Sequence, residues 1–352
     1  MTGELKSARF DPMTADAAAW GRFHELRRRH EKERRPDDPI QPDEEVEVRM
    51  KKENPFDKQH FYEMTRDGEI VSSFSGETVT PRNPEYETNK HLFWADVYVR
   101  PEDRRQGIAS RWLPVIVDVM DTHGCTVLGF FAENDAAHGF LRSIGAEPKL
   151  NSIESRLKLS EVDWAMVERW TEEGAERSPQ TKLEIYDGPL PDVVRDDFAT
   201  QITTMLNTMP MEGLDIGQII ITPERIKDWN ERQSLVGEVP HTVLTREPDG
   251  VISGITDVTW APFRRTLVHQ QFTGVLPGAR GRGLGKWIKA AMLLHLREIY
   301  PDAQWVVTDN AHSNDPMLKI NRTLGFKAYR SGVEYQIGRD ALEPRLRAVS
   351  AV

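Results

Sequence analysis

A short glycine-bearing loop occurs twice in the 352-residue chain. The first copy is Arg104-Arg105-Gln106-Gly107-Ile108-Ala109, and the second is Arg280-Gly281-Arg282-Gly283-Leu284-Gly285. Each copy follows a short apolar run and opens an amphipathic stretch that predicts a helix. Consecutive backbone N–H groups at such a helix start can point at a phosphate. The repetition therefore predicts two related units, each built to hold a phosphorylated ligand.

A second shared element follows each loop at a fixed distance. Asn134 precedes Gly145 by eleven residues, and Asn314 precedes Gly325 by the same eleven. The glycines of the two loops lie 176 residues apart and the two asparagines 180. The two separations differ by only a few residues over a whole domain, which indicates duplication of one unit, with insertions confined to loops.

The elements around the loops recur in the same order. Residues 61–71 predict a hairpin with an Asp-Gly turn, and residues 242–252 repeat it. Each hairpin leads to a strand, the loop, a helix, a buried strand and the helix that begins at the asparagine. The predicted strands are 92–99 and 127–131 in the first half, and 267–275 and 305–308 in the second.

This order places the domain boundaries. The first domain covers residues 1–160 and is closed by a strand at 153–159. Residues 161–181 form a helical connector and a linker, with the linker in the polar half from Glu172, and the second domain covers 182–352. The charged stretch 30–47 is interpreted as a solvated loop, because mixed charge runs usually are.

Together these motifs resemble the GNAT superfamily of N-acetyltransferases, repeated in tandem. The family's acyl-CoA signature is Arg or Gln, two residues, Gly, one residue, then Gly or Ala, between a strand and a helix. The first loop matches it at Arg104, Gly107 and Ala109, and the second loop matches at the corresponding positions. The resemblance covers nearly the whole chain. It implies an α/β fold of two tandem domains, each with a mixed, mostly antiparallel central sheet flanked by helices.

The resemblance also implies acetyl-CoA as the cofactor of both domains. A glycine lets the loop backbone approach phosphate oxygens without a Cβ in the way, and an arginine adds a charge-assisted contact. The strand ahead of each loop is implied to pair with the pantetheine arm and to carry a bulge that splays it from the next strand. The second copy, with its Gly-x-Gly form, is expected to be the better site. The implied cofactor-binding residues are Val97, Tyr98, Val99, Arg104, Arg105, Gln106, Gly107, Ile108, Ala109, Asn134, Thr273, Gly274, Val275, Arg280, Gly281, Arg282, Gly283, Leu284, Gly285 and Asn314.

The acid of the reaction is not identified by the sequence. In this family a tyrosine seven residues after the asparagine often protonates the departing thiolate. Leu141 and Asn321 stand at those two positions, and neither can supply that proton. Tyr98 and Tyr329 are alternative acids; water is another, and one half can also have lost catalysis.

The base is equally open. Asp96 lies on the strand ahead of the first loop, His269 on the corresponding strand of the second half, and His312 just before Asn314. Each of these side chains can take a proton from an attacking amine. Each also has an ordinary structural explanation at a strand end or in a loop.

Composition limits the classes of function. The chain is 38% apolar and 29% charged, which is typical of a globular protein and not of a disordered one. No apolar run approaches the roughly 20 residues of a membrane helix, and the first residues lack the apolar core of a signal peptide. The single Cys125 rules out an intrachain disulfide framework and fits a cytoplasmic protein. The net charge of −10 argues against nucleic-acid binding, and no metal site is expected.

Three functions follow from these observations. The first is transfer of an acetyl group from acetyl-CoA to a primary amine of a small molecule. The second is an aminoacyl-tRNA-dependent peptidyltransferase on the same doubled fold, which the acidic charge disfavours. The third is an acyl-CoA-binding module or sensor with one or both halves non-catalytic, which the missing tyrosines favour. Neither the acyl acceptor nor the oligomeric state follows from the sequence.

Overall fold

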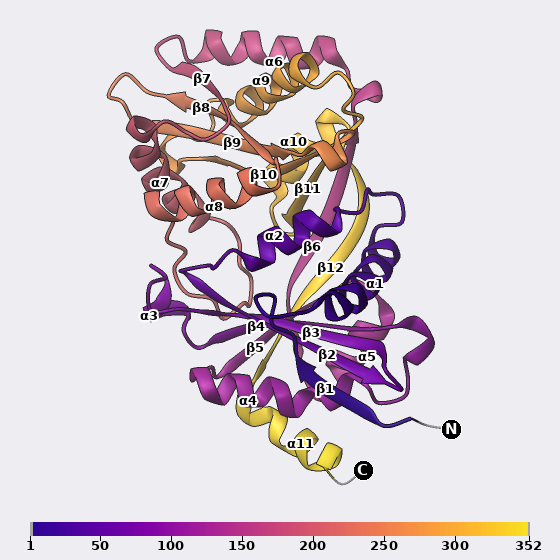
Figure 1. Ribbon diagram of the computed structural model, residues 1–352. Helices are drawn as coiled ribbons and strands as arrows, with labels where there is room; N and C mark the ends of the chain where they lie inside the picture. The colour runs from indigo at the N-terminus through magenta and orange to yellow at the C-terminus, as the bar shows by residue number, and fades with distance from the viewer. Residues whose placement is uncertain (1–2, 351–352) are drawn as a thin grey trace. The chain divides into compact units, whose positions relative to one another are not determined.

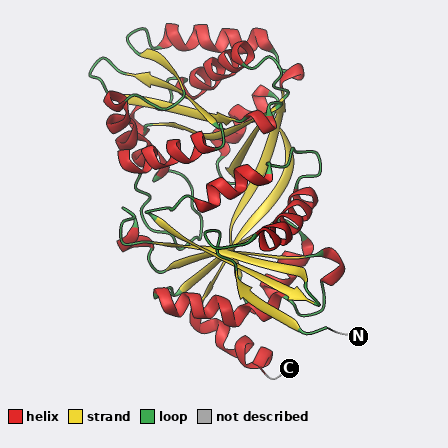
Figure 2. Ribbon diagram, in the orientation of Figure 1, coloured by secondary structure: helices red, strands yellow, loops and turns green. Residues whose placement is uncertain are grey.

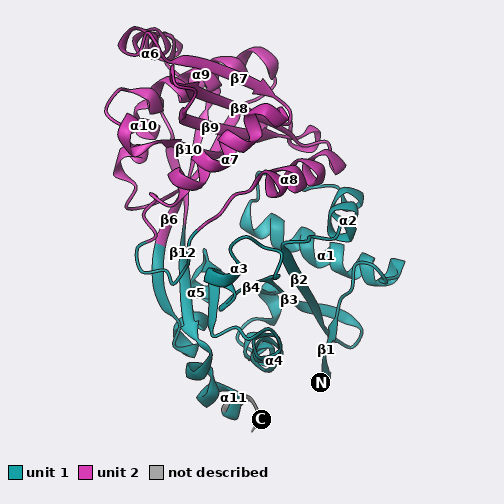
Figure 3. Ribbon diagram, turned by 90° about the vertical axis from the view of Figure 1, so that its left-hand side faces the viewer, with its two compact units in different colours: residues 1–150, 212–218, 332–352 teal, residues 151–211, 219–331 magenta. Residues whose placement is uncertain are grey.

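The computed structural model describes residues 3–350, which divide into two compact units (Figure 3). Unit 1 comprises residues up to 150, the segment 212–218 and the residues from 332 onward. Unit 2 comprises residues 151–211 and 219–331. Neither unit is continuous in sequence. The boundaries at 160 and 182 stay a prediction of where the duplicated segments begin and end.

The sheet of unit 1 follows the strand order β1-β2-β3-β4-β5-β12. The strands lie antiparallel to their neighbours except for β4 and β5, which are parallel. The β2–β3 hairpin turns at Asp67 and Gly68, which both have positive φ, as a tight two-residue hairpin turn requires. The five N-terminal strands are β1 (Leu5–Arg9), β2 (Asp57–Arg66), β3 (Glu69–Val79), β4 (Leu92–Val99) and β5 (Val127–Ala132).

The sheet of unit 2 repeats this arrangement in the order β6-β11-β10-β9-β8-β7. Its one parallel pair is β10 with β11, the counterpart of β4 with β5. The strands are β7 (Lys182–Asp187), β8 (Val239–Arg246), β9 (Ile252–Trp260), β10 (Leu267–Val275) and β11 (Trp305–Ala311). The mixed, mostly antiparallel sheets expected from the sequence are therefore confirmed.

The last strand of the first sequence repeat, β6, ends in the sheet of unit 2. The last strand of the second repeat, β12, ends in the sheet of unit 1. The C-terminal part of β12 (Lys327–Gly338) pairs with β5 through residues 333–338, in unit 1. The C-terminal part of β6 (Glu147–Lys158) pairs with β11 through residues 152–158, in unit 2. The expectation that residues 153–159 close the first unit is wrong, because those residues pair with β11.

Helices flank both sheets (Figure 2). In unit 1, α4 and α11 lie on one side of the sheet, and α1 and α2 lie on the other (Figure 1). The unit 1 helices are α1 (Ala17–Arg34), α2 (Asp43–Lys51), α3 (Tyr86–Asn89), α4 (Leu113–His123), α5 (Asp135–Ile144) and α11 (Glu343–Ser350). Those of unit 2 are α6 (Trp164–Arg177), α7 (Asp192–Leu206), α8 (Pro223–Leu235), α9 (Leu284–Ile299) and α10 (Asp315–Leu324). Within residues 3–350, no helix combines the length and apolarity needed to cross a membrane.

Two segments expected to be loops are largely helical. The charged stretch 30–47 contains the last turns of α1 and the start of α2, and Arg27 of α1 donates to Asp43 of α2 at 2.6 Å. The polar stretch from Glu172 continues α6 up to Arg177, because Gly174 packs against the Trp287 side chain of α9. In both cases tertiary contacts on one face of the helix outweigh the polar composition of the other.

The core of unit 1 lies between α4 and the sheet. Trp112, which directly precedes α4, is fully buried against Phe74. Its indole Nε1 donates to Ser72 Oγ at 2.8 Å, and Ser72 Oγ donates to the carbonyl of Tyr98 at 2.6 Å. These two hydrogen bonds tie the start of α4, β3 and β4 together. Truncation of Trp112 to Ala is expected to cost about 3–5 kcal/mol of folding free energy.

Candidate active site

A cavity of about 720 Å³ opens in unit 1 where strands β4 and β5 separate. The parallel pairing of these strands ends at Ala95 and Phe130, although β4 continues to Val99 and β5 to Ala132. The free end of β4 lines one wall, and Phe131, Glu133 and Asn134 line the other. The slot that the resemblance implied ahead of the first loop is therefore present.

The bulge implied for both strands occurs in only one of them. β10 has a register shift against β9 between Gln270 and Phe272, and Asp257 Oδ1 accepts from the Phe272 amide at 3.0 Å. β4 pairs with β3 without a shift from Ser72–Val99 to Glu77–Trp94. The expectation of a bulge in β4 is wrong, because β4 leaves β5 without losing its register with β3.

The first glycine-bearing loop forms the floor of the cavity. Its backbone has positive φ at Arg105 (64°) and at Gly107 (77°), and a Cβ placed on Gly107 would have no heavy atom within 4 Å. A short 3₁₀ turn, Ala109–Trp112, comes between the loop and α4. Arg104, Arg105, Gly107, Ile108 and Ala109 line the cavity, and Gln106 is exposed at the tip of the loop.

A buried carboxylate fixes the shape of this loop. Asp103 accepts from Arg66 Nη1 at 2.9 Å and from Arg100 Nε at 2.7 Å. Arg66 also donates from Nη2 to the side-chain oxygen of Gln106 at 3.0 Å. Arg104 Nε donates to the carbonyl of Val99 at 3.0 Å, which joins the loop to the end of β4. The backbone amides of the loop are therefore held in place before any ligand arrives.

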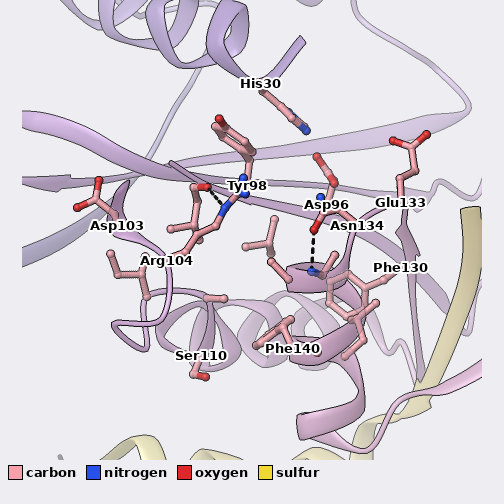
Figure 4. A pocket seen from close by; sticks show the side chains of 18 of the residues that line it. His30, Asp96, Tyr98, Asp103, Arg104, Ser110, Phe130, Glu133, Asn134 and Phe140 are labelled. Carbon is pink, nitrogen blue, oxygen red and sulfur yellow. Dashed lines mark hydrogen bonds between the residues drawn. The ribbon is translucent and has the colours of Figure 1, made fainter. Parts of the chain in front are cut away.

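Polar side chains meet at the mouth of the cavity (Figure 4). The His30 ring from α1 stacks on the Tyr98 ring, with centroids 4.2 Å apart. Burial lowers the pKa of His30, while the charge of Asp96 acts in the opposite direction. Burial and the nearby Glu33 carboxylate raise the pKa of Tyr98 far above its usual value. At neutral pH the imidazole is therefore neutral and the phenol keeps its proton.

Three residues of this mouth were missed by the sequence reasoning. His30 and Glu33 come from α1, and Glu133 follows β5. Glu33 accepts from the Tyr98 hydroxyl at 3.1 Å and from Arg104 Nη2 at 2.7 Å. His30 and Asp96 are 66 positions apart in sequence. No local motif joins them, and the charge pattern predicted a solvated loop at His30, whereas it lies in α1.

Asn134 has the capping role that its position suggested. Its side-chain oxygen accepts from the Ala137 amide at 2.9 Å and begins α5, and its side chain also lines the cavity. α5 ends at Gly145, which is left-handed with φ 92°. Leu141, at the family's tyrosine position, also lines the cavity. Its side chain cannot donate a proton there.

The second loop has a similar backbone and, like the first, is contacted by residues of its own unit. Gly281 and Gly283 have φ of 82° and 85°, and α9 begins at Leu284. Arg282 donates to Glu247 at 2.9 Å and to Thr181 at 2.6 Å. Arg280 Nη2 donates to Thr208 at 2.7 Å and its Nε to the Val275 carbonyl at 3.2 Å.

The remaining second-half candidates surround the parting of β10 and β11. Thr273 shares a hydrogen bond of 2.8 Å with Thr256, and the Phe272 ring lies against Gly274. Gly285 faces Ile320 of α10, whose Cδ1 would lie 3.4 Å from an added Cβ. Asn314 precedes α10 but makes no side-chain capping bond within the described residues.

The point where β10 and β11 part contains polar side chains. The last residue of β10 to pair with β11 is Gln270, the counterpart of Ala95. Gln270 Oε1 accepts from the buried Lys289 of α9 at 3.2 Å, and its Nε2 donates to the Phe272 carbonyl at 3.1 Å. Farther along unit 2, Asn321 of α10 donates to Asn310 Oδ1 of β11 at 2.8 Å. Where the strands part, unit 2 thus has the polar Gln270 and unit 1 has the apolar Ala95 and Phe130.

The second-half catalytic candidates are spread over different elements. His269 lies within β10 and pairs with Val307 of β11. His312 is exposed after β11, and its amide donates to the Asn151 carbonyl at 2.8 Å. Tyr329 lies at the start of β12, with the Arg156 guanidinium 3.6 Å above its ring.

Comparisons with known proteins agree with this geometry. The sequence profile of the Acetyltransferase (GNAT) family matches residues 22–146. A mycothiol acetyltransferase from Thermomonospora curvata is 29% identical over 169 residues, which cover 45% of this chain and 54% of that protein. The chain thus matches about half the length of this curated relative.

Two solved structures resemble the chain over almost its full length. One is a tandem GNAT protein from the clavulanic acid biosynthesis pathway, with TM-score 0.73, 17% identity and coverage of 96% of this chain and 99% of that one. The other is a GCN5-related N-acetyltransferase from Sphaerobacter thermophilus, with TM-score 0.65, 14% identity and coverage of 95% and 96%. At these identities the likeness concerns the fold. Residues 22–146 thus match the GNAT acetyltransferase family, and the chain has the fold of a tandem GNAT protein along almost its full length.

Proposed function

We propose that unit 1 transfers an acetyl group from acetyl-CoA to a primary amine of a small molecule. One observation carries this proposal: a single cavity extends from the glycine-bearing loop to His30 and Asp96, between the separated ends of β4 and β5. Its volume of about 720 Å³ lies within the usual range for small-molecule and cofactor sites.

The residues of this cavity suit the cofactor. The loop backbone from Arg105 to Ala109 would hold the pyrophosphate, since the open space beside Gly107 is what a Cβ would otherwise fill. The free edge of β4 at Val97–Val99 would pair with the amide-bearing arm, and Phe130 and Phe140 supply apolar walls. When bound, acetyl-CoA supplies the activated acetyl group as a thioester.

The side chains at the mouth supply proton transfer. An amine must be neutral to attack a thioester, so a group near the cavity has to take its proton. His30 serves this purpose because burial keeps its imidazole neutral at pH 7. The negative charge of Asp96 stabilises the imidazolium that forms, since it favours the protonated ring.

The charge at the mouth favours a cationic acceptor. Glu33, Asp96 and Glu133 all line the cavity, where Arg34 is held by Glu133 at 2.5 Å. Glu33 and Glu133 are paired with Arg104 and Arg34, so Asp96 is the carboxylate best placed to attract an ammonium group to the opening. A small amine also agrees with the net charge of −10, which disfavours a nucleic-acid substrate.

Unit 2 is assigned a second, non-catalytic role. Gln270 and Lys289 occupy the point where its slot would begin, and Arg282 is bound to Glu247 and Thr181. These contacts favour a structural half over a second acetyltransferase site.

Two measurements test the proposal. Acetyl-CoA at 100 times its Kd should stabilise the ligand-free protein by about 2.7 kcal/mol, seen as a higher melting temperature. A library of primary amines should then contain members that release CoA thiol in the presence of the protein. A melting temperature unchanged by acetyl-CoA would refute the cofactor assignment. Binding without thiol release across the library would favour a binding module.

A further inference from the structure

Three side chains from separate elements of unit 2 converge at one end of its sheet. Asp187 ends β7, His241 lies in β8 and His295 lies in α9, which are neighbouring elements in Figure 3. Asp187 Oδ1 is 2.6 Å from His241 Nδ1 and 2.6 Å from His295 Nε2. The three atoms all lie within 4.8 Å of one another. The histidines are 54 and 108 positions from Asp187 in sequence, so no motif indicated the cluster.

The donor set is that of a transition-metal site. Two imidazole nitrogens and one carboxylate oxygen bind Zn²⁺ and similar divalent ions in proteins, at bond lengths of about 2.0–2.2 Å. In a tetrahedral site with such bonds, ligand atoms are separated by about 3.3 Å. The Oδ1–nitrogen distances would have to lengthen by less than about 1 Å to admit an ion between the three groups. Asp187 can make this adjustment, because its side chain is 56% exposed at the end of an edge strand.

The second nitrogen of His241 is already oriented. Its Nε2 lies 2.7 Å from the Tyr300 hydroxyl, and the Tyr300 ring stacks on Trp260 with centroids 4.4 Å apart. When Nδ1 binds an ion, Nε2 carries the proton and donates a hydrogen bond to the Tyr300 oxygen. An outer hydrogen bond of this kind fixes the tautomer and orientation of most histidines that bind metals.

Exposure differs across the cluster in a way that suits an ion. The His241 and His295 side chains are largely buried, whereas Asp187 faces solvent. An ion held by these three groups would keep a position open to water on the side of Asp187. The two buried histidines would be rigidly held ligands, and the exposed carboxylate would be the third ligand.

We propose that Asp187, His241 and His295 form a binding site for one divalent transition-metal ion of the zinc class. The site joins the edge strand β7 to β8 and α9 and is independent of the acetyl-transfer site proposed for unit 1. The competing interpretation is a hydrogen-bonded cluster in which the carboxylate alone bridges the two imidazoles.

Zinc titration of the full chain tests this proposal. Tag-free protein is dialysed against a chelator and then titrated with Zn²⁺ by calorimetry, and Co²⁺ is used as a spectroscopic substitute. The variants are His295→Gln and Asp187→Asn. His91→Gln serves as the matched control, because His91 also contacts an aspartate, Asp215, at 3.1 Å but belongs to unit 1. Circular dichroism and melting in chelator verify that each variant is folded.

The proposal predicts one Zn²⁺ per chain in the wild type and in His91→Gln, with affinity at least 10-fold weaker in both cluster variants. It also predicts intense Co²⁺ absorption of low-coordinate type that is lost in His295→Gln. No binding by the wild type at 50 µM Zn²⁺ would overturn the assignment. Equal binding by folded His295→Gln would overturn it as well.

Discussion

The two glycine-bearing loops have similar backbones but different surroundings. In unit 1 the loop faces a cavity, and the strands beside it part at Ala95 and Phe130, which are apolar. In unit 2 the strands part at Gln270, whose side chain binds Lys289 and the bulged backbone of β10. The same order of strand, loop and helix thus leads to apolar residues beside a cavity where the strands of unit 1 part, and to hydrogen-bonded polar side chains where those of unit 2 part.

This difference shows what a loop motif specifies. Glycines at positive φ set the path of the chain, and they do so in both units. Whether a ligand fits depends on side chains from other elements, such as Leu113 or Lys289 at equivalent positions in the helix that follows. The second loop has the fuller glycine pattern, and its arginines bind residues of their own unit, as Arg104 of the first loop also does. Which half is the better cofactor site therefore stays a prediction.

The proposed catalytic residues should give the largest contrast between the units. His30→Gln and Asp96→Asn are each expected to lower kcat by about 10²–10³, because the attacking amine then loses its proton acceptor or the charge that supports it. His269→Gln and His312→Gln, in unit 2, should stay within about 2-fold of wild type. Steady-state kinetics on an amine found in the library measure all four. A large loss in either unit 2 variant would reverse the assignment of the active half.

The same assay has an expected pH dependence. His30 acts as a base only when it is unprotonated, and its pKa is lowered below 6.5. The kcat/KM profile should therefore have an acid limb below pH 6.5 that is absent in His30→Gln. A wild-type limb with its midpoint above pH 7 would point to another base.

The loops themselves give the next contrast. Gly107→Glu forces a side chain into a left-handed position and places a carboxylate where the phosphates would bind, so affinity for acetyl-CoA should fall about 100-fold. Gly283→Glu is the matched change, at φ 85°, and should leave the affinity within about 2-fold. Calorimetry measures both values and the stoichiometry. Two equivalents bound by wild type, with one lost in each variant, would mean that both loops bind the cofactor.

Replacement of the buried Lys289 should have a smaller effect, which is a change in the free energy of unfolding. Burial lowers the pKa of Lys289 to about 7 from its ordinary 10.5. Between those values the unfolded chain holds a proton that the folded chain does not, so the cost of burial grows as pH falls from 10.5 to about 7 and is constant below. Lys289→Leu should therefore raise the free energy of unfolding at pH 7 by roughly 1–3 kcal/mol.

Two contacts make this gain in unfolding free energy smaller than burial of the amine alone would give. Lys289 donates to Gln270 and lies 5.4 Å from the Phe326 ring centroid, and both contacts favour the charged amine. Denaturant unfolding at pH 7 and pH 10.5 measures the effect, which should shrink at the higher pH. The reciprocal change in unit 1, Leu113→Lys, should destabilise by about 3 kcal/mol. A gain for Lys289→Leu that is larger at pH 10.5 would contradict this account.

The smallest contrast concerns the arginines of the loops. Arg282→Ala removes the contacts to Glu247 and Thr181 and should lower stability by about 0.5–1 kcal/mol without changing acetyl-CoA affinity. Arg104→Ala should instead weaken acetyl-CoA binding, because its guanidinium lines the cavity. Paired melting and calorimetry measure the two effects. Weaker binding in Arg282→Ala would show that the second loop holds the cofactor.

Much of the fold was predictable because it depends on local patterns. The duplication, the strand–loop–helix order and the mixed sheets followed from periodicity and from turn residues such as Asp67 and Gly68. The family resemblance followed from two loops with the same spacing to Asn134 and Asn314. Each of these signals involves residues close together in the chain.

The rest depends on contacts between distant residues. Nothing in the sequence near His30 indicates Tyr98 as its stacking partner, or Arg27 as the partner of Asp43 in a supposed loop. The exchange of β6 and β12 was equally hidden, because a strand pattern specifies which face is buried and not which neighbour it pairs with. The contact between Lys289 of α9 and Gln270 of β10 was hidden for the same reason, because it joins a helix to a sheet.

The exchanged strand ends have a consequence for how the chain is made. Residues 333–338 complete the unit 1 sheet beside β5, which ends about 200 positions earlier at Ala132. During synthesis the edge of β5 therefore lacks this partner until residues 333–338 have left the ribosome, and exposed edges invite mispairing. Loss of residues 333–338 would therefore damage the unit that carries the proposed active site, although these residues lie far from that site in the sequence.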